Sequence, residues 1–260
     1  MHPDLIRIGS FALPSYGVAL ACAFLASIWL LRRRAPSFGV KRDDAADVAI
    51  WLLLSGLLGA KVLLLVVEGP RYLRSWGDFV EFLRSGGVFY GGLIGAVLAL
   101  AIVLRKRHIG FWTFADMAAP AVALGHAIGR IGCFLAGCCW GRECSLPWAV
   151  TFTDPVAERN VGVPLNVPLH PTQLYEALGN VVILGLLLKF EKRRWKGQTF
   201  AWYLGAYAIL RGTLEFFRGD PRGSVLDGAV STSQLIAVAG LAAAVGISWW
   251  NRGQPADSSA

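Results

Sequence analysis

The segment that decides the fold runs from residue 114 to residue 136 and reads FADMAAPAVALGHAIGRIGCFLA. It is long enough to cross a bilayer, because a transmembrane helix needs about 20 predominantly apolar residues. It nevertheless contains Arg130, whose guanidinium stays protonated at every accessible pH. A charge inside a bilayer costs on the order of 3 kcal/mol and usually marks a functional site, so we expect Arg130 to bind an anionic group. Gly129 and Gly132 leave room for a ligand or a helix to approach the backbone.

The whole chain has the composition of a membrane protein. Apolar residues make up 55% of the 260 residues, charged residues only 16%, and the mean hydropathy is +0.52. We therefore predict an all-α, polytopic membrane protein of about seven spans, with one domain over residues 1–251 and a disordered tail over 252–260. A helix lying in the interface is expected within 68–86, and a short strand or surface-lying element over 148–153. The predicted spans cover residues 12–31, 46–67, 86–104, 114–136, 171–189, 198–217 and 232–249.

Lysine and arginine predict the orientation of these spans. Basic residues are more numerous, and closer to the spans, in the loops after the first, third and fifth spans than in the alternate loops. Because such residues favour the cytoplasmic side, we expect the N-terminus outside and the C-terminus in the cytoplasm. The net charge of +8 then serves mostly as an anchor against anionic lipid. No basic face is interleaved with exposed aromatic residues, so nucleic acid is not an expected partner.

This orientation brings polar residues of different spans to one depth, near the outer headgroups. On the fourth span, His126 lies one helical turn before Arg130 and on the same face. The fifth span begins on the outer side with His170-Pro-Thr-Gln-Leu-Tyr-Glu176, which places Gln173, Tyr175 and Glu176 just inside the boundary. Tyr16 and Tyr90 lie near the outer ends of the first and third spans. We interpret the convergence as a site for a lipid phosphate.

The outer end of the sixth span contributes a polar stripe. Tyr207, Arg211, Glu215 and Arg218 follow one another at spacings of four, four and three, so they share one helix face. A structural alternative is that Arg211 and Glu215 form an i,i+4 ion pair and that Arg218 extends its charge to the interface. Charges at Arg130, Glu176 and Arg211 at one buried level favour the functional interpretation, because each is costly in lipid.

At these residues the chain resembles the prolipoprotein diacylglyceryl transferase family. Two of the matching motifs, Ser15-Tyr-Gly17 and Gly91-Gly-Leu-Ile-Gly95, are weaker than the others. Together the motifs cover nearly the whole chain, in the family's order and with its seven-span layout. The main matches are Gly129-Arg-Ile-Gly-x-Phe, Gly137, Trp140-Gly-Arg142, His170-Pro-Thr-Gln-Leu-Tyr-Glu176, Tyr207, Arg211 and Glu215-Phe-Phe-Arg218.

The resemblance implies transfer of the diacylglyceryl group of phosphatidylglycerol to the thiol of a lipobox cysteine in a preprolipoprotein. It implies a thioether product, release of glycerol phosphate, no cofactor or metal, and a site facing the outer leaflet of a bacterial plasma membrane. Arg130 and Arg211 would stabilise the negative charge that develops on the phosphate. The expected substrate-binding residues are Tyr16, Gly129, Gly132, His170, Gln173, Tyr175, Glu176, Tyr207, Glu215 and Arg218.

Three departures from the family's pattern concern the base that activates the thiol. Cys133 stands where the family has Asn, and Ala136 and Cys138 replace a further Asn and a Glu. Tyr90 replaces a His thought to matter for catalysis, and a tyrosine with a pKa near 10 is a poor base. His126 could take over, so His126 and Tyr90 both join the candidate catalytic residues. The alternative for His126 is a packing role with a hydrogen bond to a neighbour.

Cys133, Cys138, Cys139 and Cys144 form a cluster with several interpretations. One or two disulfides would close the loop beside the site if the cluster faces an oxidising exterior. Small apolar packing and a reactive thiol acting as a covalent relay are alternatives. A metal site is not expected, because no Cys-x-x-Cys pair occurs with a partner pair.

Two other functions compete with the one that the resemblance implies. A related phospholipid-dependent transferase with a different acceptor is supported by the missing His, Asn and Glu. A non-enzymatic lipid-binding subunit or transporter is the third hypothesis. Against it, the polar residues gather at one depth, whereas a transport path also needs polar groups at mid-membrane and on the cytoplasmic side.

Overall fold

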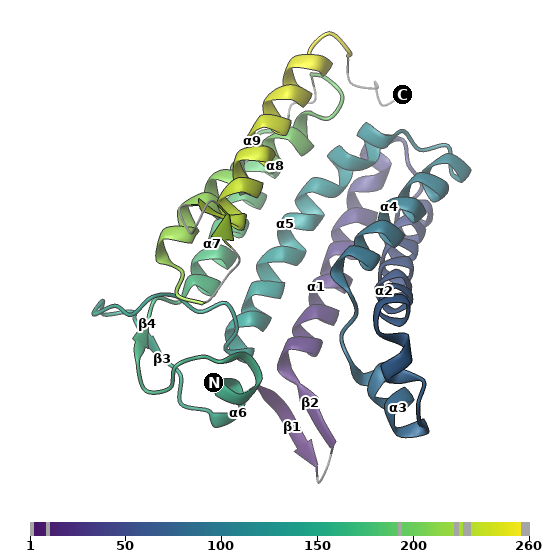
Figure 1. Ribbon diagram of the computed structural model, residues 1–260. Helices are drawn as coiled ribbons and strands as arrows, with labels where there is room; N and C mark the ends of the chain where they lie inside the picture. Colours follow the sequence, from purple (N-terminus) through teal and green to yellow (C-terminus); the bar gives the residue numbers. More distant parts are fainter. Residues whose placement is uncertain (1–2, 9–10, 192–193, 221–223, 226–229, 256–260) are drawn as a thin grey trace. The chain divides into compact units, whose positions relative to one another are not determined.

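The computed structural model is mainly helical and describes residues 3–8, 11–191, 194–220, 224–225 and 230–255 (Figure 1). The chain divides into two compact units. One comprises residues 1–30 with 115–260, and the other comprises residues 31–114. The polar residues predicted for the site lie in the first unit, apart from Tyr90, which lies in the second.

Helices form at all the predicted spans. Among the described residues, five stretches are long and apolar enough to cross a membrane: α1 (Ser15–Arg34) with the following turn η1 (Ala35–Phe38), α2 (Arg42–Tyr72), α4 (Phe89–Lys106), α5 (Phe111–Ala136) and α9 (Thr232–Asn251). The fifth and sixth predicted spans fold as α7 (Thr172–Lys189) and α8 (Gln198–Leu214). A helical, multi-pass membrane protein is therefore confirmed, while seven crossings and the orientation remain predictions.

Two predicted span boundaries were wrong, because a strand precedes one of the helices and a separate turn follows the other. Residues 12–14, predicted to open the first span, belong to β2 (Phe11–Pro14), which pairs with β1 (Asp4–Ile8) in an antiparallel hairpin. The sixth span ends at Leu214, and the turn η2 (Glu215–Phe217) follows it. Of the tail predicted to be disordered, residues 252–255 form a turn in which Pro255 pairs with Trp195, and 256–260 lie outside the described residues.

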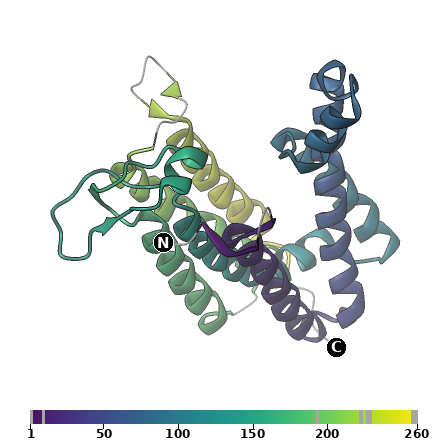
Figure 2. The same cartoon turned by 90° about the horizontal axis from the view of Figure 1, so that it is seen from below.

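In the unit of residues 31–114, α2 and α4 lie side by side (Figures 1 and 2). Glycine makes this approach close: a Cβ on Gly59, Gly91 or Gly95 would run into the backbone of the opposite helix. Small residues are the usual means of packing helices in lipid, where the hydrophobic effect does not drive their association. The interfacial helix predicted within 68–86 corresponds to α3 (Trp76–Arg84), whose first turn is capped by Ser75.

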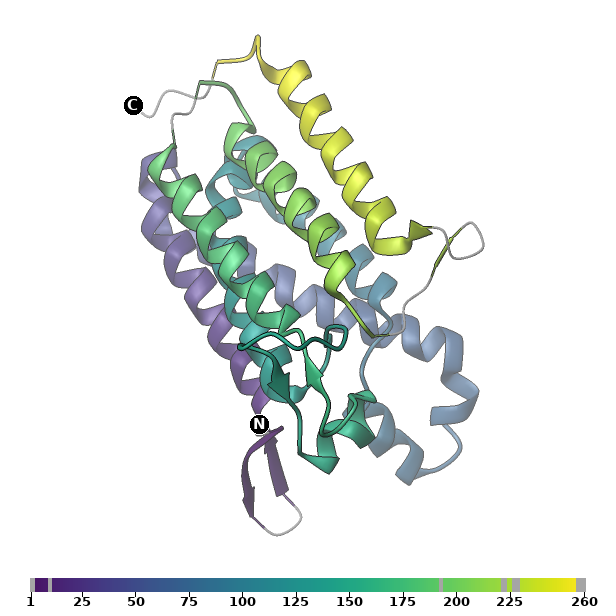
Figure 3. The same cartoon turned by 90° about the vertical axis from the view of Figure 1, so that its left-hand side faces the viewer.

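In the other unit, α7, α8 and α9 run alongside one another (Figures 1 and 3). A hydrophobic core joins α5, α7 and α8. It consists of Ala119 and Ala123 from α5, Ile183 and Leu187 from α7, and Tyr203 from α8. Asp116 of α5 accepts hydrogen bonds of 2.8 Å from the Gly197 amide and 2.9 Å from the Phe200 amide. A side chain of α5 therefore caps the start of α8 and fixes the two helices to each other.

The loop between α5 and α7 has a small core of its own. It contains β3 (Val150–Thr151), α6 (Pro155–Val161) and β4 (Pro168–Leu169), and β3 pairs with β4. Its buried residues are Phe152, Ala157, Val163 and Leu169. The short strand predicted over 148–153 is confirmed by β3. Between η2 and α9, β5 (Ser224–Val225) pairs with β6 (Val230–Ser231).

Candidate functional site

The candidate site is centred on Glu176, which lies in the second turn of α7 and is completely buried. Its Oε1 lies 3.0 Å from Nη2 of Arg130 and accepts a hydrogen bond of 3.0 Å from the Tyr207 hydroxyl. Nε2 of His126 is 3.5 Å from the same oxygen, and Nη1 of Arg218 is 4.0 Å from Oε2. Helices α5 and α8 and the residue after η2 thus bring four polar side chains to one carboxylate of α7.

His126 and Arg130 reach Glu176 together because they are one turn apart on α5. The His126 ring packs on Tyr207, with 4.8 Å between ring centroids, and its Nε2 is 3.5 Å from the Tyr207 hydroxyl. Tyr207 in turn stacks on Tyr203 at 6.0 Å. His126 is therefore both packed and within reach of the polar centre, so the geometry is compatible with a base as well as with a packing role.

Two arginine donors in this group, Nε of Arg130 and Nη1 of Arg218, are buried without a hydrogen-bond partner among the described residues. Arg218 directs its other donors, Nε and Nη2, to the two oxygens of Asp220, each at 2.9 Å. A buried donor without an acceptor costs about 1–3 kcal/mol, and such groups are rare in folded proteins. Phosphate oxygens are strong acceptors for guanidinium donors, so an anionic headgroup fits this position.

The segment of residues 140–142 fixes the position of Arg218. The Gly141 amide donates to the His170 carbonyl at 3.2 Å, and the Arg142 amide donates to the Phe217 carbonyl at 2.8 Å. A Cβ on Gly141 would meet both of these carbonyl oxygens, so the close approach requires glycine. Nε of Arg142 also donates to the Arg218 carbonyl at 3.1 Å. The start of α7 and the end of η2 are thereby joined through one short loop.

Other predicted residues of the His170–Glu176 motif form two groups away from the carboxylate. Nδ1 of His170 lies 3.2 Å from the Tyr175 hydroxyl, which also accepts a 2.7 Å hydrogen bond from Nε1 of Trp148. Both rings pack on Phe217. Gln173, completely buried, instead donates to the Cys138 carbonyl at 2.7 Å. These residues shape the loop beside the site, and their contact with substrate remains a prediction.

Arg211 has a different environment from that of Arg130. Its Nη1 forms the i,i+4 ion pair with Glu215 at 2.7 Å, and its Nη2 donates to the Ser233 hydroxyl at 2.6 Å. The structural pair considered from the sequence is therefore present, and it ties the end of α8 to the first turn of α9. A direct role for Arg211 and Glu215 toward substrate stays a prediction.

The two predicted glycines of α5 have different surroundings. A Cβ on Gly132 would meet Ala19 and the Tyr16 ring, so Gly132 lets α1 approach α5. A Cβ on Gly129 would meet nothing within 4 Å among the described residues other than its chain neighbours. Gly129 therefore has open space beside its Cα, which suits the approach of a ligand to the backbone.

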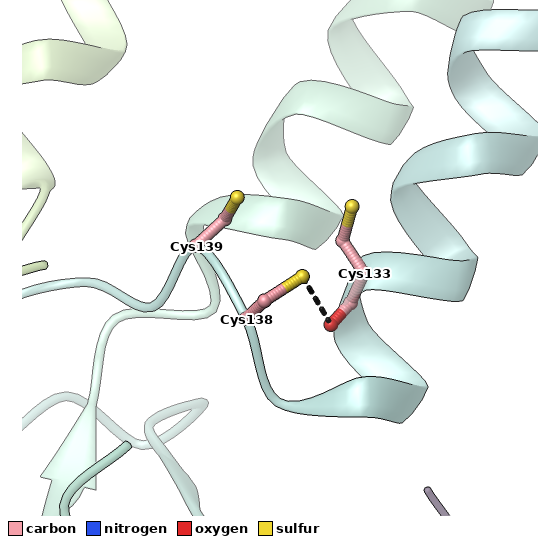
Figure 4. A group of neighbouring side chains, drawn as sticks. All are labelled: Cys133, Cys138 and Cys139. Carbon is pink, nitrogen blue, oxygen red and sulfur yellow. Dashed lines mark hydrogen bonds between the residues drawn. The ribbon is translucent and has the colours of Figure 1, made fainter. Parts of the chain in front are cut away.

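The thiols of Cys133, Cys138 and Cys139 gather in one place (Figure 4). Their three Sγ atoms lie within 4.8 Å of one another. Nη1 of Arg130 is 3.5 Å from Sγ of Cys139 and 4.0 Å from Sγ of Cys133. Within the described residues, no disulfide joins any of the five cysteines. Cys144, predicted as part of the same cluster, does not belong to this group of three.

Two thiols of the group lie beyond the end of α5, and their environments shift their pKa values in opposite directions. Hydrogen bonds with the Cys133 and Cys138 thiols lower the pKa of the Cys139 thiol despite its burial, and the Arg218 guanidinium adds to the effect. Hydrogen bonds with the Cys133 and Cys139 thiols raise the pKa of the Cys138 thiol. Burial disfavours the charge on Arg218, but the Asp220 carboxylate and the nearby Cys139 sulfur give it a net raised pKa.

Comparison with known proteins identifies the relationships of this chain. A family model described as prolipoprotein diacylglyceryl transferase matches residues 3–250. The chain belongs to the prolipoprotein diacylglyceryl transferase family. A phosphatidylglycerol–prolipoprotein diacylglyceryl transferase of Clostridium tetani is 35% identical over 92% of this chain and 93% of the relative. The enzyme of Acaryochloris marina is 32% identical over 95% and 90%, and transferase 2 of Clostridium perfringens is 34% identical over 86% and 85%.

For this member of the transferase family, the candidate bases lie in different units. His126 belongs to the Glu176 group, whereas Tyr90 lies in the first turn of α4 in the unit of residues 31–114, where it is 70% exposed. Of the residues at the positions where the sequence departs from the family's pattern, Cys133 contacts Arg130, and Cys138 belongs to the same group of three thiols. The replacements therefore fall inside the site and bear directly on its chemistry.

Sequence reasoning missed several residues that complete the transferase site. Asp220, which binds Arg218 through both oxygens, follows it by only two residues, and that spacing was a usable signal. Trp148 and Ser233 hold Tyr175 and Arg211 from distant segments. Thr172 donates to the Cys139 carbonyl at 2.8 Å. No local pattern marks these three, because their partners are far away in the chain.

Proposed function

We propose that this chain transfers the diacylglyceryl group of phosphatidylglycerol to the lipobox cysteine thiol of a prolipoprotein. Membership of the family supports the reaction. The observation that carries the assignment is the buried group of Arg130, Glu176, Tyr207 and Arg218, in which two arginine donors have no hydrogen-bond partner among the described residues. We place the site at the outer leaflet of a bacterial plasma membrane, in a protein with seven crossings and a cytoplasmic C-terminus. The distribution of lysine and arginine supports that orientation.

In the proposed reaction, the phosphate of the lipid lies against Arg130 and Arg218. Breaking the bond between the glyceryl carbon and the phosphate oxygen develops negative charge on the leaving glycerol phosphate. Guanidinium donors fixed in a site with little water stabilise that charge without having to reorganise. Glu176 and Tyr207 position Arg130, and Asp220 positions Arg218. The arginines thereby act on the transition state more strongly than on the intact lipid.

The acceptor thiol must lose its proton before it attacks the glyceryl carbon. Its lone pair then forms the C–S bond, and the electrons of the C–O bond leave on the phosphate. His126 is the side chain of the Glu176 group best suited to accept a proton, since its Nε2 is 3.5 Å from both the Tyr207 hydroxyl and Glu176. Tyr90 is the other candidate from the sequence. Both assignments rest on the proposed reaction.

The reaction is tested by incubating the purified protein in detergent with phosphatidylglycerol and a lipobox peptide. Mass spectrometry should show a diacylglyceryl adduct on the peptide's cysteine, together with released glycerol phosphate. The same peptide with Ser in place of Cys is the control and should remain unmodified. Absence of any adduct, from protein shown to be folded and to bind the lipid, would contradict the proposal.

A second candidate function keeps the lipid donor and changes the acceptor. The observation that favours it is the replacement of the family's Asn, Asn and Glu beside Arg130 by Cys133, Ala136 and Cys138. Offering the protein labelled phosphatidylglycerol with a membrane extract distinguishes the two functions. Label on lipoproteins alone supports the first, and label on another class of acceptor supports the second.

A further inference from the structure

The three thiols beside Arg130 come from two kinds of backbone. Cys133 lies in the last turn of α5, and Cys138 and Cys139 follow the end of that helix (Figure 4). The Cys138 amide donates to the Cys133 carbonyl at 3.1 Å, and the Cys138 thiol lies 3.6 Å from the same oxygen. The loop thus folds back onto the helix end, which brings two sulfur atoms to the third.

Several contacts hold the loop in this shape. Gln173 donates to the Cys138 carbonyl at 2.7 Å and Thr172 to the Cys139 carbonyl at 2.8 Å, so the first turn of α7 fixes both residues. Gly137 and Cys139 have φ values of 82° and 64°. A left-handed backbone is unusual for a residue other than glycine and persists only where surrounding contacts impose it. The thiols are therefore presented by a preorganised loop.

We propose that Cys133, Cys138 and Cys139 bind a metal ion of the zinc class and leave its fourth coordination position to the acceptor thiol. Zinc–thiolate bonds are about 2.3 Å long, so the sulfur atoms of a tetrahedral site lie about 3.8 Å apart. The three Sγ atoms already lie within 4.8 Å of one another. The remaining difference is at most about 1 Å. Three protein ligands with one open position are the arrangement of a catalytic zinc site.

The charges around the thiols agree with three bound thiolates. Three thiolates and one divalent ion carry a net charge of −1, and Nη1 of Arg130 lies 3.5 Å and 4.0 Å from two of the sulfur atoms, where it can donate to them. N–H donors directed at coordinating atoms are the usual second layer of a metal site and orient its ligands.

The metal site would assist the thiol activation for which His126 is the proposed base, and this step rests on the proposed function. Coordination lowers the pKa of the acceptor thiol, which becomes a bound thiolate as its proton passes to His126. Its sulfur lone pair forms the C–S bond with the glyceryl carbon, and the C–O electron pair leaves on the phosphate. The thioether product is a weaker ligand than a thiolate, so it can dissociate from the ion.

Metal binding is tested without any substrate. The full chain, purified under reducing, metal-free conditions in detergent, is titrated with Zn²⁺ and, as a spectroscopic probe, with Co²⁺. One ion per chain and a thiolate-to-cobalt charge-transfer band are expected. Cys133→Ser, Cys138→Ser and Cys139→Ser should each weaken binding by at least about tenfold. Cys22→Ser and Cys144→Ser are the matched controls and should bind like the unaltered chain.

Two results would overturn the metal site. One is the failure of the reduced chain to bind either ion. The other is binding by Cys133→Ser, Cys138→Ser and Cys139→Ser that is as tight as binding by the unaltered chain. Gel filtration and thermal unfolding of each variant separate a lost ligand from a lost fold. Zn²⁺ should raise the midpoint of thermal unfolding of the unaltered chain and leave that of Cys139→Ser unchanged.

The activation step has its own readout in the transfer assay with a lipobox peptide. Removing the ion with a chelator should abolish adduct formation, and Zn²⁺ should restore it. Full transfer by the metal-free protein would contradict the activation step while leaving the proposed function intact. Bound zinc without any transfer would count against the proposed function and leave the metal site intact.

Discussion

Arg130 of α5 and Glu176 of α7 lie 3.0 Å apart, and Glu176 is completely buried. The same guanidinium lies 3.5 Å from the Cys139 thiol, so one arginine links the carboxylate group to the thiols. A buried pair of this kind does not by itself stabilise a fold, because removing both charges from water is costly. Two arginine donors at this position have no hydrogen-bond partner in the part of the chain that the structure describes, which favours a role in holding an anionic substrate.

Glu176→Gln should impair both folding and activity. The substitution leaves Arg130 with a neutral neighbour, and breaking a buried ion pair typically costs about 3–5 kcal/mol. We expect a lower midpoint of thermal unfolding and a more than tenfold loss of transfer rate. Glu143→Gln, on the exposed part of the loop after α5, is the control and should change neither quantity. Unchanged activity in Glu176→Gln would show that transfer does not need the Glu176 carboxylate.

Tyr207→Phe should lower activity without unfolding the protein. The ring keeps its packing on His126 and Tyr203, while the hydroxyl's hydrogen bond to Glu176 and its 3.5 Å contact with Nε2 of His126 are lost. A hydrogen bond to a charged group contributes about 1.5–3 kcal/mol, which corresponds to a loss of transfer rate between about tenfold and about hundredfold. Tyr203→Phe, one turn earlier on α8, removes a hydroxyl outside the Glu176 group. Equal rates for the two variants would show that the Tyr207 hydroxyl is not needed.

Gly141→Ala should displace the loop that positions Arg218. The added methyl group would meet the carbonyl oxygens of His170 and Phe217, and overpacking of this kind costs about 1–3 kcal/mol. We expect a lower unfolding midpoint and a strong loss of transfer. Gly246→Ala is the matched control. Gly246 lies on α9, and a Cβ there would meet none of the described side chains within 4 Å. A Gly141→Ala protein as stable and active as Gly246→Ala would show that the close approach is not required.

Asp116→Ala should destabilise the helices with little effect on the chemistry. It removes the acceptor for the Gly197 and Phe200 amides at the start of α8, and loss of a helix cap costs about 0.5–2 kcal/mol. Thermal unfolding should move to lower temperature, while the transfer rate per folded molecule stays close to that of the unaltered chain. A severe loss of rate at full stability would assign Asp116 to the site.

Much of the site was predictable because charge is conspicuous in apolar sequence. Arg130 and Glu176 were identified by their cost in lipid, and the i,i+4 spacing placed His126 beside Arg130. Helical periodicity also predicted the pairing of Arg211 with Glu215 as an alternative. The same periodicity could not reveal that Tyr207 and Arg218 turn toward Glu176 while Arg211 turns toward Ser233. That difference depends on where α8 ends and on contacts with α9.

The thiol group illustrates the limit of sequence spacing. Cys133, Cys138 and Cys139 do not follow a familiar ligand pattern, so the sequence argued against a metal site. Their convergence depends on the left-handed backbone at Gly137 and Cys139 and on hydrogen bonds from Thr172 and Gln173. Gly137 just after the helix end is a local signal for the left-handed turn, but the hydrogen bonds from Thr172 and Gln173 come from a distant segment, so no local pattern could predict the whole geometry.

The most direct test of the central claim compares the unaltered chain with Arg130→Ala in the transfer assay. Both proteins must first give the same gel-filtration profile in detergent. We predict that Arg130→Ala forms no measurable diacylglyceryl adduct on a lipobox peptide, while Arg74→Ala, an exposed arginine after α2, matches the unaltered chain. Transfer by folded Arg130→Ala at the rate of the unaltered chain would contradict the claim that this buried arginine is the centre of the site.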